Sequence, residues 1–280
     1  MYKILKKEYL NPTVVRMDIL APEVARRAEA GQFIILRATA DGERIPLTVA
    51  DYDREAGSVT IIFQVVGAST ETLSHLNEGE CLSDFAGPLG RKTHTEGIKT
   101  VAVVGGGVGS AIAYPVAKKL HSQGADVDAI VGFRTRDLVI LEDEFRAASR
   151  ELHLMTDDGS YGEKGLVTEA LEKLILEGRK YDEVIAIGPL PMMKFVSLLT
   201  KKYGIKTIVS MNPIMVDGTG MCGGCRLTVG GEVKFACVDG PEFDGHLVDF
   251  DEAIRRSAMY REFETKSREE TCNLFKKEVE

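Results

Sequence analysis

The stretch VAVVGGGVGSAIAYPVAKKL, residues 101–120, decides the fold, because it joins an apolar run to a helix-like segment through a turn with four glycines. Glycines let the chain turn tightly after a strand and approach a phosphate, whose charge is favoured by free N–H groups at a helix N-terminus. The stretch predicts a strand, a turn and a helix, either with a phosphate at the turn or as a tight connection without a ligand. The candidate contacts are Gly105, Gly106, Gly107, Val108 and Gly109.

The segment from 98 to 211 continues this alternation. Its apolar runs are 101–104, 127–133, 152–155, 184–187 and 206–210, and its helical stretches are 110–123, 141–150, 165–177 and 192–203. Strands that alternate with helices predict an α/β domain with a doubly wound parallel sheet.

The glycine turn departs from the Gly-x-Gly-x-x-Gly spacing of a standard dinucleotide-binding domain. The next strand ends in Gly132-Phe133-Arg134-Thr135-Arg136, where such a domain places an acidic ligand for the ribose. A plain dehydrogenase is therefore disfavoured.

Two further loops follow predicted strands, after 152–155 and after 184–187. Open α/β sheets receive ligands beyond the carboxyl ends of their strands, so we expect these loops to share one nucleotide crevice with the glycine turn. Each loop taken alone could be an ordinary turn. The candidate nucleotide-binding residues are Arg134, Asp157, Asp158, Gly159, Ser160, Gly188, Pro189 and Met192.

The sequence pattern before this segment and the pattern after it both differ from the alternation of strands and helices. Short β-runs at 3–9, 13–20, 32–38, 45–50, 58–66 and 81–85 predict a small antiparallel barrel. After 211 the chain is rich in Gly and Cys, then acidic, and it ends in a charged helix-like tail from about 251. The predicted domains are a β barrel at 1–97, the α/β domain at 98–211 and a small C-terminal domain at 212–280.

Composition fits a folded chain of several modules. The 280 residues exceed the usual single-domain length, and 44% hydrophobic with 28% charged residues is ordinary globular composition. A net charge of −8 shows no excess of basic residues, which disfavours nucleic-acid binding. Residues 1–15 lack the apolar core of a signal peptide, and glycines and Pro115 interrupt the long uncharged run at 101–117. Export and membrane insertion are therefore not expected.

A barrel followed by this kind of α/β domain resembles the ferredoxin reductase family over about residues 3–211. In that family the barrel holds FAD, the second domain holds NAD(P)H, and an Arg-x-Tyr-Ser/Thr motif lines the flavin; the matching stretch is Arg44-Ile45-Pro46-Leu47-Thr48. A second motif, near the FAD phosphates, matches Gly67-Ala68-Ser69-Thr70. The alternative is that Thr48 and Thr70 are only strand and turn residues. The resemblance implies FAD contacts by Arg44, Pro46, Leu47, Thr48, Val66, Gly67, Ser69 and Thr70.

The C-terminal domain carries the most specific motif, Asp-x4-Cys-x2-Cys-x11-Cys, formed by Asp217, Cys222, Cys225 and Cys237. It mirrors the plant-type Cys-x4-Cys-x2-Cys run that binds a 2Fe-2S cluster. Structural zinc is the main rival, because three thiolates and a carboxylate also suit a tetrahedral site. We favour the cluster because a flavin domain needs a one-electron acceptor. Three grouped cysteines also favour a metal or redox site over disulfides, and hence a cytoplasmic location.

The whole chain resembles electron-transfer subunits that join an FAD and NAD module to a 2Fe-2S domain. Two families compete, the electron-transfer subunit of dihydroorotate dehydrogenase and the small subunit of NADH-dependent ferredoxin:NADP oxidoreductase. The first normally has cysteine where Asp217 stands, whereas the second is similar at Asp217, at 44–48 and in the tail at 237–260. We therefore favour the second family.

This resemblance implies a subunit of a flavin and iron–sulfur oxidoreductase with three cofactors, FAD, NAD(H) and a 2Fe-2S cluster. NADH would give a hydride to FAD beside Thr48, and electrons would leave singly through the cluster, with no catalytic acid or base. The partner would be a larger flavoprotein with further iron–sulfur clusters, where electron bifurcation takes place and ferredoxin is reached. The alternative from another class is a non-enzymatic, zinc-stabilised nucleotide-binding module.

Three remaining residues are not expected to take part in the chemistry. Cys81 is predicted to be a barrel core thiol, His246 a solvated residue of an acidic loop, and Cys272 an exposed bystander.

Overall fold

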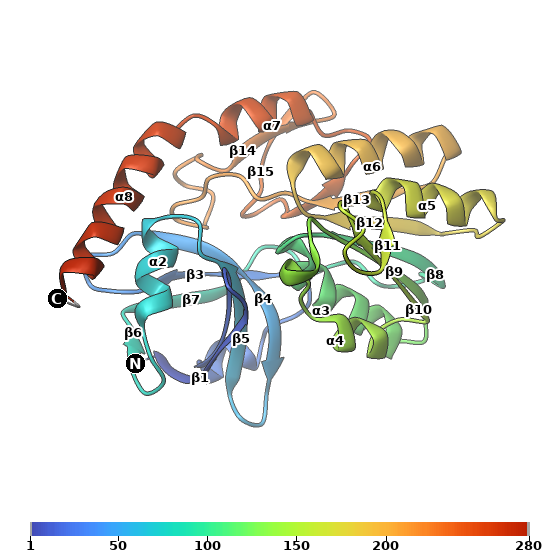
Figure 1. The fold of residues 1–280 in the computed structure, drawn as a ribbon. Coiled ribbons are helices and arrows are strands. Elements are labelled where there is room, and N and C mark those ends of the chain that lie inside the picture. The colour runs from blue at the N-terminus through green and yellow to red at the C-terminus, as the bar shows by residue number, and fades with distance from the viewer. Residues whose placement is uncertain (1, 279–280) are drawn as a thin grey trace.

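The computed structural model describes the backbone of residues 2–278 and the side chains up to residue 271. Two seven-stranded sheets and one two-stranded hairpin form the molecule (Figure 1). The barrel lies beside the parallel sheet, and the last segment of the chain crosses over both (Figure 1).

The first sheet is an antiparallel, nearly closed barrel with the strand order β6-β1-β2-β5-β4-β3-β7. Its apolar side chains alternate along neighbouring strands, and pairs such as Val15 with Phe63 and Met17 with Ile61 lie in register and buried. The elements are β1 (Tyr2–Asn11), β2 (Val14–Leu20), α1 (Pro22–Ala25), β3 (Phe33–Arg37), β4 (Arg44–Asp53), β5 (Ser58–Gln64), α2 (Ala68–His75), β6 (Cys81–Leu82) and β7 (Asp84–Leu89).

The second sheet has the order β11-β10-β9-β8-β12-β13-β16, and all its neighbouring strands are parallel except β13 and β16. Helices α3 and α4 cover one face and α5 and α6 cover the other (Figure 1). The strand order reverses between β8 and β12, which is the place where such sheets bind ligands. The elements are β8 (Thr100–Gly106), α3 (Gly109–Ser122), β9 (Asp126–Phe133), η1 (Arg136–Leu138), α4 (Glu142–Ala147), β10 (Glu151–Thr156), β11 (Glu163–Lys164), α5 (Val167–Leu176), β12 (Glu183–Ile187), α6 (Leu190–Tyr203) and β13 (Thr207–Ser210).

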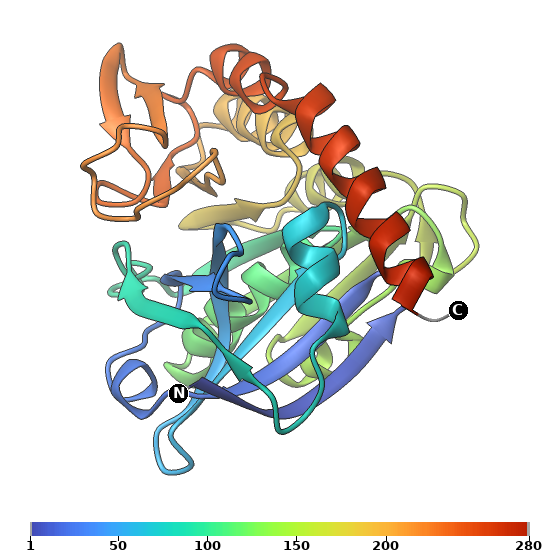
Figure 2. The ribbon, with the colours of Figure 1, turned by 90° about the vertical axis from the view of Figure 1, so that its left-hand side faces the viewer.

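The last segment is tied to both sheets. It contains β14 (Arg226–Val229), β15 (Glu232–Phe235), β16 (Glu242–Asp244), α7 (Phe250–Ser257) and α8 (Arg261–Glu278). Strand β16 extends the parallel sheet, and α8 runs back beside α2 of the barrel (Figure 2). Because β16 belongs to the sheet of the second predicted domain, the division into 1–97, 98–211 and 212–280 stays a proposal.

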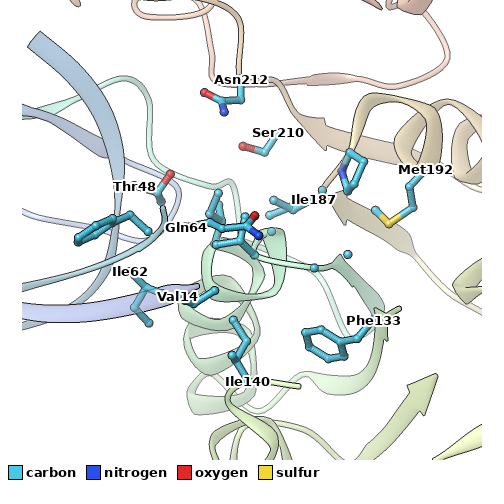
Figure 3. A pocket seen from close by; sticks show the side chains of 18 of the residues that line it. Val14, Thr48, Ile62, Gln64, Phe133, Ile140, Ile187, Met192, Ser210 and Asn212 are labelled. Atoms are coloured by element: carbon cyan, nitrogen blue, oxygen red, sulfur yellow. The ribbon is translucent and has the colours of Figure 1, made fainter. Parts of the chain in front are cut away.

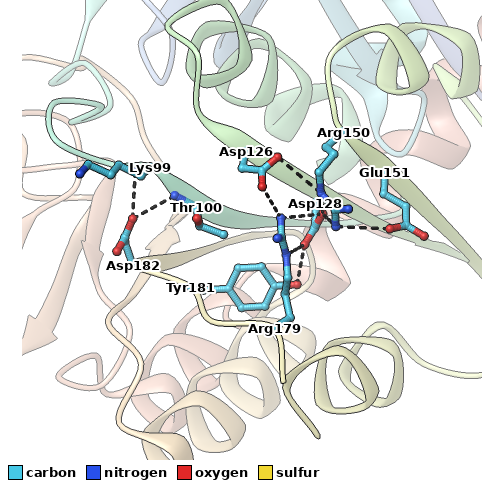
Figure 4. Close-up of polar contacts among 9 residues, drawn as sticks. All are labelled: Lys99, Thr100, Asp126, Asp128, Arg150, Glu151, Arg179, Tyr181 and Asp182. Carbon is cyan, nitrogen blue, oxygen red and sulfur yellow. Dashed lines mark hydrogen bonds and ion pairs between the residues drawn. The ribbon is translucent and has the colours of Figure 1, made fainter. Parts of the chain in front are cut away.

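A charged network holds the amino ends of the parallel strands, opposite the ligand-binding edge (Figure 4). The fully buried Asp128 carboxylate of β9 accepts hydrogen bonds from Arg150 Nη2 at 2.6 Å, Arg179 Nε at 2.7 Å and Tyr181 Oη at 2.8 Å. Burial opposes its charge, but the bonds from Arg179, Tyr181 and Arg150 prevail and hold the pKa of Asp128 below its ordinary value. This network locks β9 to the loops before β10 and β12.

Three local predictions are wrong. The run at 81–85 is two strands, because the N–H of Ser83 bonds to the carbonyl of Arg37 instead of continuing one ladder. Cys81 is exposed, since Leu82 takes the inward position of this short edge strand. His246 is half-buried, with Nε2 3.0 Å from Thr200 Oγ1.

The side chain of Cys272 lies outside the described residues. Within the described chain, no helix is both long and apolar enough to cross a membrane.

Candidate functional site

A cavity of about 680 Å³ opens between the barrel and the carboxyl edge of the parallel sheet (Figure 3). This volume lies within the range of small-molecule and cofactor sites. Four parts of the chain line the cavity: the barrel strands, the β8 and β12 switch point, the loops after β9 and β10, and the segment after β13. Residues predicted from sequence that line it are Pro46, Leu47, Thr48, Val66, Thr70, Gly106, Gly107, Val108, Gly109, Arg134, Asp157, Gly188, Pro189 and Met192.

Two glycines shape the switch point. Gly107 has a φ of +54°, and a Cβ there would meet no atom within 4 Å, so this backbone faces open space in the cavity wall. A Cβ on Gly109 would lie 2.6 Å from Cα of Gly188 and 2.7 Å from the carbonyl oxygen of Ile187. Only glycine therefore lets the start of α3 pack this closely on the end of β12. In the first turn the N–H groups of Ser110 and Ala111 bond to the carbonyls of Gly107 and Val108.

The barrel wall of the cavity is mostly apolar with a few polar groups. Thr48 of β4 pairs with Phe33 of β3, and both line the cavity with Ile62 and Gln64 of β5. Figure 3 shows Thr48 and Gln64 on the side of the barrel and Ile187 on the side of the sheet. An apolar slot with a hydroxyl and an amide at its edge fits a flat ring system such as a flavin.

Several predicted contacts lie outside the cavity wall. Arg44 is 55% exposed and its guanidinium is 3.9 Å from the Asp84 carboxylate. Ser69 Oγ donates to Glu43 at 3.4 Å. Thr70 does line the cavity, but its hydroxyl accepts from the N–H groups of Val66 and Gly67 and caps α2. The other predicted residues that the lining does not include are Gly67, Gly105, Asp158, Gly159 and Ser160.

The loop after β10 is held together by its own polar groups. Ser160 Oγ accepts from the N–H of Arg136 at 2.8 Å, and hydrogen bonds from Ser160 lower the pKa of Asp158. The guanidinium of Arg136 lies 5.2 Å from the centre of the Tyr161 ring. These contacts leave Arg134 and Asp157 as the charged residues of this region that line the cavity.

Sequence reasoning missed Gln64, Ser210 and Asn212, which bring polar side chains to the cavity (Figure 3). Ser210 ends a predicted strand and Asn212 follows it, so the strand-end argument used for the other loops would have found both. No sequence pattern indicated Gln64, because the direction of its side chain depends on the pairing of β5 with β2.

The cysteine loops pack against the barrel beside this cavity. Cys225 and Cys237 are buried with their sulfurs 3.2 Å apart, in one core with Phe33 and Ile35 of β3. Burial and the neighbouring Cys225 thiol raise the pKa of Cys237 to about 12. Phe33 also lines the cavity, so one barrel side chain belongs both to the core around the thiols and to the cavity wall.

Cys222 and Asp217 lie at the surface of the same loop. Cys222 is exposed, and its sulfur is 3.4 Å from the N–H of Gly224. The Asp217 carboxylate accepts from the N–H groups of Thr219 and Cys222, each at 2.8 Å, and these bonds lower its pKa. The carboxylate caps this turn, so its role as a ligand stays a prediction.

The donor chemistry fits an iron–sulfur cluster, although the loop is not closed around one centre. Among the described residues no three His, Cys, Asp or Glu side chains converge on a metal position. The structure brings the thiols of Cys225 and Cys237 together. The third, Cys222, begins the Cys-x2-Cys run in a loop with positive φ at Gly218, Gly220 and Gly223. Such glycines let backbone N–H groups approach sulfur, which suits a cluster.

Comparisons with known proteins identify the family. Residues 212–249 match the iron–sulfur cluster binding domain of dihydroorotate dehydrogenase B. A dihydroorotate dehydrogenase B (NAD(+)) electron transfer subunit homolog of Thermotoga maritima is 49% identical over 94% of this chain and 92% of its own length. The chain belongs to the dihydroorotate dehydrogenase B electron-transfer subunit family. An uncharacterized protein in the adh 3′ region of Clostridium beijerinckii is 54% identical over 95% of this chain and 93% of its own.

A solved structure covers nearly the whole chain. It is the NADH-dependent reduced ferredoxin-NADP oxidoreductase structure described for flavin-based electron bifurcation, with a TM-score of 0.92 and 45% identity over 96% of this chain and 97% of that chain. These findings confirm the predicted fold, an oxidoreductase subunit, and the cofactors FAD, 2Fe-2S and NAD(H). They also imply a larger catalytic partner subunit.

Proposed function

We propose that this chain is the NADH-linked electron-transfer subunit of a bifurcating NADH-dependent ferredoxin:NADP oxidoreductase. The observation that carries this proposal is the full-length match to the structure of such an enzyme. A match over all three parts of the chain supports the same arrangement of nucleotide, flavin and cluster sites, rather than a shared reductase fold alone.

The electron-transfer subunit of dihydroorotate dehydrogenase is the second candidate, because the Thermotoga relative carries that name. The two candidates differ at the first ligand position, where the dihydroorotate family normally has cysteine and this chain has Asp217. The aspartate favours the first candidate.

The residues of the cavity would hold two cofactors in contact. The glycine turn and the start of α3 would receive the phosphates of NADH, and Arg134 and Asp157 would lie at its adenosine end. Thr48 would orient the flavin ring through its hydroxyl, while Phe33, Leu47 and Ile62 exclude water from the ring. When bound, FAD supplies the step between two-electron hydride chemistry and one-electron transfer.

The cluster would be held by Cys222, Cys225, Cys237 and Asp217. Met221 is 88% exposed and Val216 is 54% exposed, so the loop presents apolar side chains at the proposed electron exit. An exposed apolar patch at this place supports a partner that covers it. We propose that this partner is a larger flavoprotein with additional clusters, through which ferredoxin is reached.

Isolation of the native complex tests the proposal. Purification through a tag on this chain is expected to recover a larger flavoprotein and an activity in which NADP+ reduction requires both NADH and reduced ferredoxin. Recovery of a dihydroorotate-oxidising partner would replace this function with the second candidate. A colourless chain with stoichiometric zinc would support the non-enzymatic module.

Variants of single cysteines separate cluster loss from general damage. Cys225→Ala is expected to remove the iron while FAD is retained. Cys81→Ala is the matched control, because this thiol lies on the barrel edge and its removal should leave both iron and FAD unchanged. Equal iron loss in both variants would reject the assignment of the loop. The cytoplasmic location stays a proposal that rests on the grouped cysteines.

A further inference from the structure

Three arginines from three different elements donate hydrogen bonds to the backbone of the cysteine loops. Arg226, at the start of β14, bonds to the carbonyl of Gly223 at 3.2 Å. Arg256 of α7 bonds to the carbonyl of Gly224, the residue before Cys225, at 3.3 Å. Arg91, just after β7, bonds to the carbonyl of Val238, the residue after Cys237, at 3.1 Å.

Arg256 differs from the other two in its surroundings. It is half-buried, whereas Arg91 and Arg226 are exposed. Arg91 Nη2 is also 3.8 Å from the Asp239 carboxylate, which offsets its charge. Within the described residues Arg256 has no carboxylate within ion-pair distance. Its charge therefore acts on the cysteine loop with less screening than the charge of either neighbour.

The acidic groups near this loop are already engaged. Asp217 accepts two backbone N–H bonds, Asp239 accepts from the N–H of Phe235, and Glu252 of α7 accepts from the N–H of Thr228. These carboxylates bond to backbone N–H groups and none forms an ion pair with Arg256, whose guanidinium is held in place by a loop carbonyl two residues from Cys222.

We infer that Arg256 is a positioning residue that raises the reduction potential of the iron–sulfur centre and fixes the Cys222–Cys225 turn from outside the loop. The inference rests on the proposed cluster. Reduction adds one negative charge to the centre, so a nearby fixed cation stabilises the reduced form more than the oxidised form. Arg91 acts in the same direction with a smaller effect because Asp239 opposes it.

The test is a redox titration of the purified holo-subunit, followed by EPR and by visible circular dichroism. Arg256→Gln keeps a hydrogen-bond donor but removes the charge, and it is expected to shift the reduction equilibrium towards the oxidised form by about tenfold, or 59 mV for a one-electron couple. Arg256→Lys is expected to restore most of the potential. Arg255→Gln removes a charge from the exposed neighbouring position of the same helix, and its shift should stay below about twofold, which is the matched control.

Three results would overturn the inference. The first is an unchanged potential in Arg256→Gln with full iron content, and the second is an equal shift in Arg255→Gln. The third is a lowered potential that Arg256→Lys does not restore, because a purely steric role would produce it. Failure of the proposed function is distinct. A dihydroorotate-oxidising partner would replace that function and leave the cluster and the Arg256 shift in place, whereas a zinc module would contain no iron and give no cluster signal at all.

Discussion

Gly109→Ala should weaken the nucleotide site more than an alanine at any other glycine of the switch point. The new Cβ would lie 2.6 Å from Cα of Gly188, and ordinary contact begins at 3.4 Å, so the backbones must separate by about 0.8 Å (3.4 − 2.6). Both partners are backbone atoms, which cannot rotate away. An overpacked contact of this kind costs about 1–3 kcal/mol, or about 2–10 °C in Tm for a chain of this size.

The displaced helix start should weaken NADH binding at least about tenfold, which is 1.4 kcal/mol. FAD and iron should stay at the parent level, because the barrel and the cysteine loops do not contain this contact. The assay combines calorimetric NADH titration, thermal unfolding, and flavin and iron analysis. Gly124→Ala is the matched control: its φ of +87° strains the other end of α3, yet a Cβ there meets no atom within 4 Å.

The control should lose about 1 kcal/mol of stability and keep its NADH affinity. If Gly109→Ala lowers Tm but leaves the NADH dissociation constant within twofold of the parent value, the nucleotide does not bind at this turn. If neither quantity changes, the close approach of α3 to β12 is itself wrong.

Three further predictions concern other parts of the molecule. Asp128→Asn removes the buried charge that Arg150 and Arg179 share, while both arginines keep their ion pairs with Asp126, and should cost about 1–3 kcal/mol in urea unfolding at pH 7. The folded state lowers the pKa of Asp128, so this carboxylate contributes its full stabilisation above the ordinary pKa of 3.8 and loses it as pH falls through the folded pKa. The unfolding free energies of parent and variant should therefore converge in acid. A difference in unfolding free energy that stays constant with pH would argue against the network. Asp217→Cys should retain a 2Fe-2S cluster with a changed spectrum and potential, whereas Asp217→Ala should make it labile; an unchanged spectrum in the first would show that Asp217 only caps its turn. Cofactor analysis of the anaerobically prepared chain should give one FAD and two iron atoms, and stoichiometric zinc without iron would defeat the cluster assignment.

The general fold could be predicted because its signals are local. Alternating apolar residues indicate the barrel strands, and the apolar runs at 101–104 and 184–187 indicate buried parallel strands. The same reasoning failed where long-range pairing decides the structure. Strand β16 joins the parallel sheet through β13, and nothing in its own three residues indicates that edge.

The candidate site was predictable in part for a similar reason. Strand ends of one sheet meet at one edge, so Gly107, Asp157 and Gly188 could be placed together before the structure was known. Gln64 could not, because its side chain reaches the cavity only through the register of the barrel. The loop carbonyls that Arg91 and Arg256 bond could not be predicted either, since Arg91 lies far from Val238 in the chain and Arg256 far from Gly224.

Electrons from NADH are expected to pass through the flavin of this chain to its own iron–sulfur centre. The most direct measurement is an anaerobic NADH titration of the purified holo-subunit, followed by visible absorption and by EPR with spin counting against iron. We expect bleaching of the flavin band together with a reduced 2Fe-2S signal that approaches one spin per two iron atoms. A flavin that NADH bleaches while the iron stays EPR-silent, in a sample whose cluster dithionite does reduce, would contradict it.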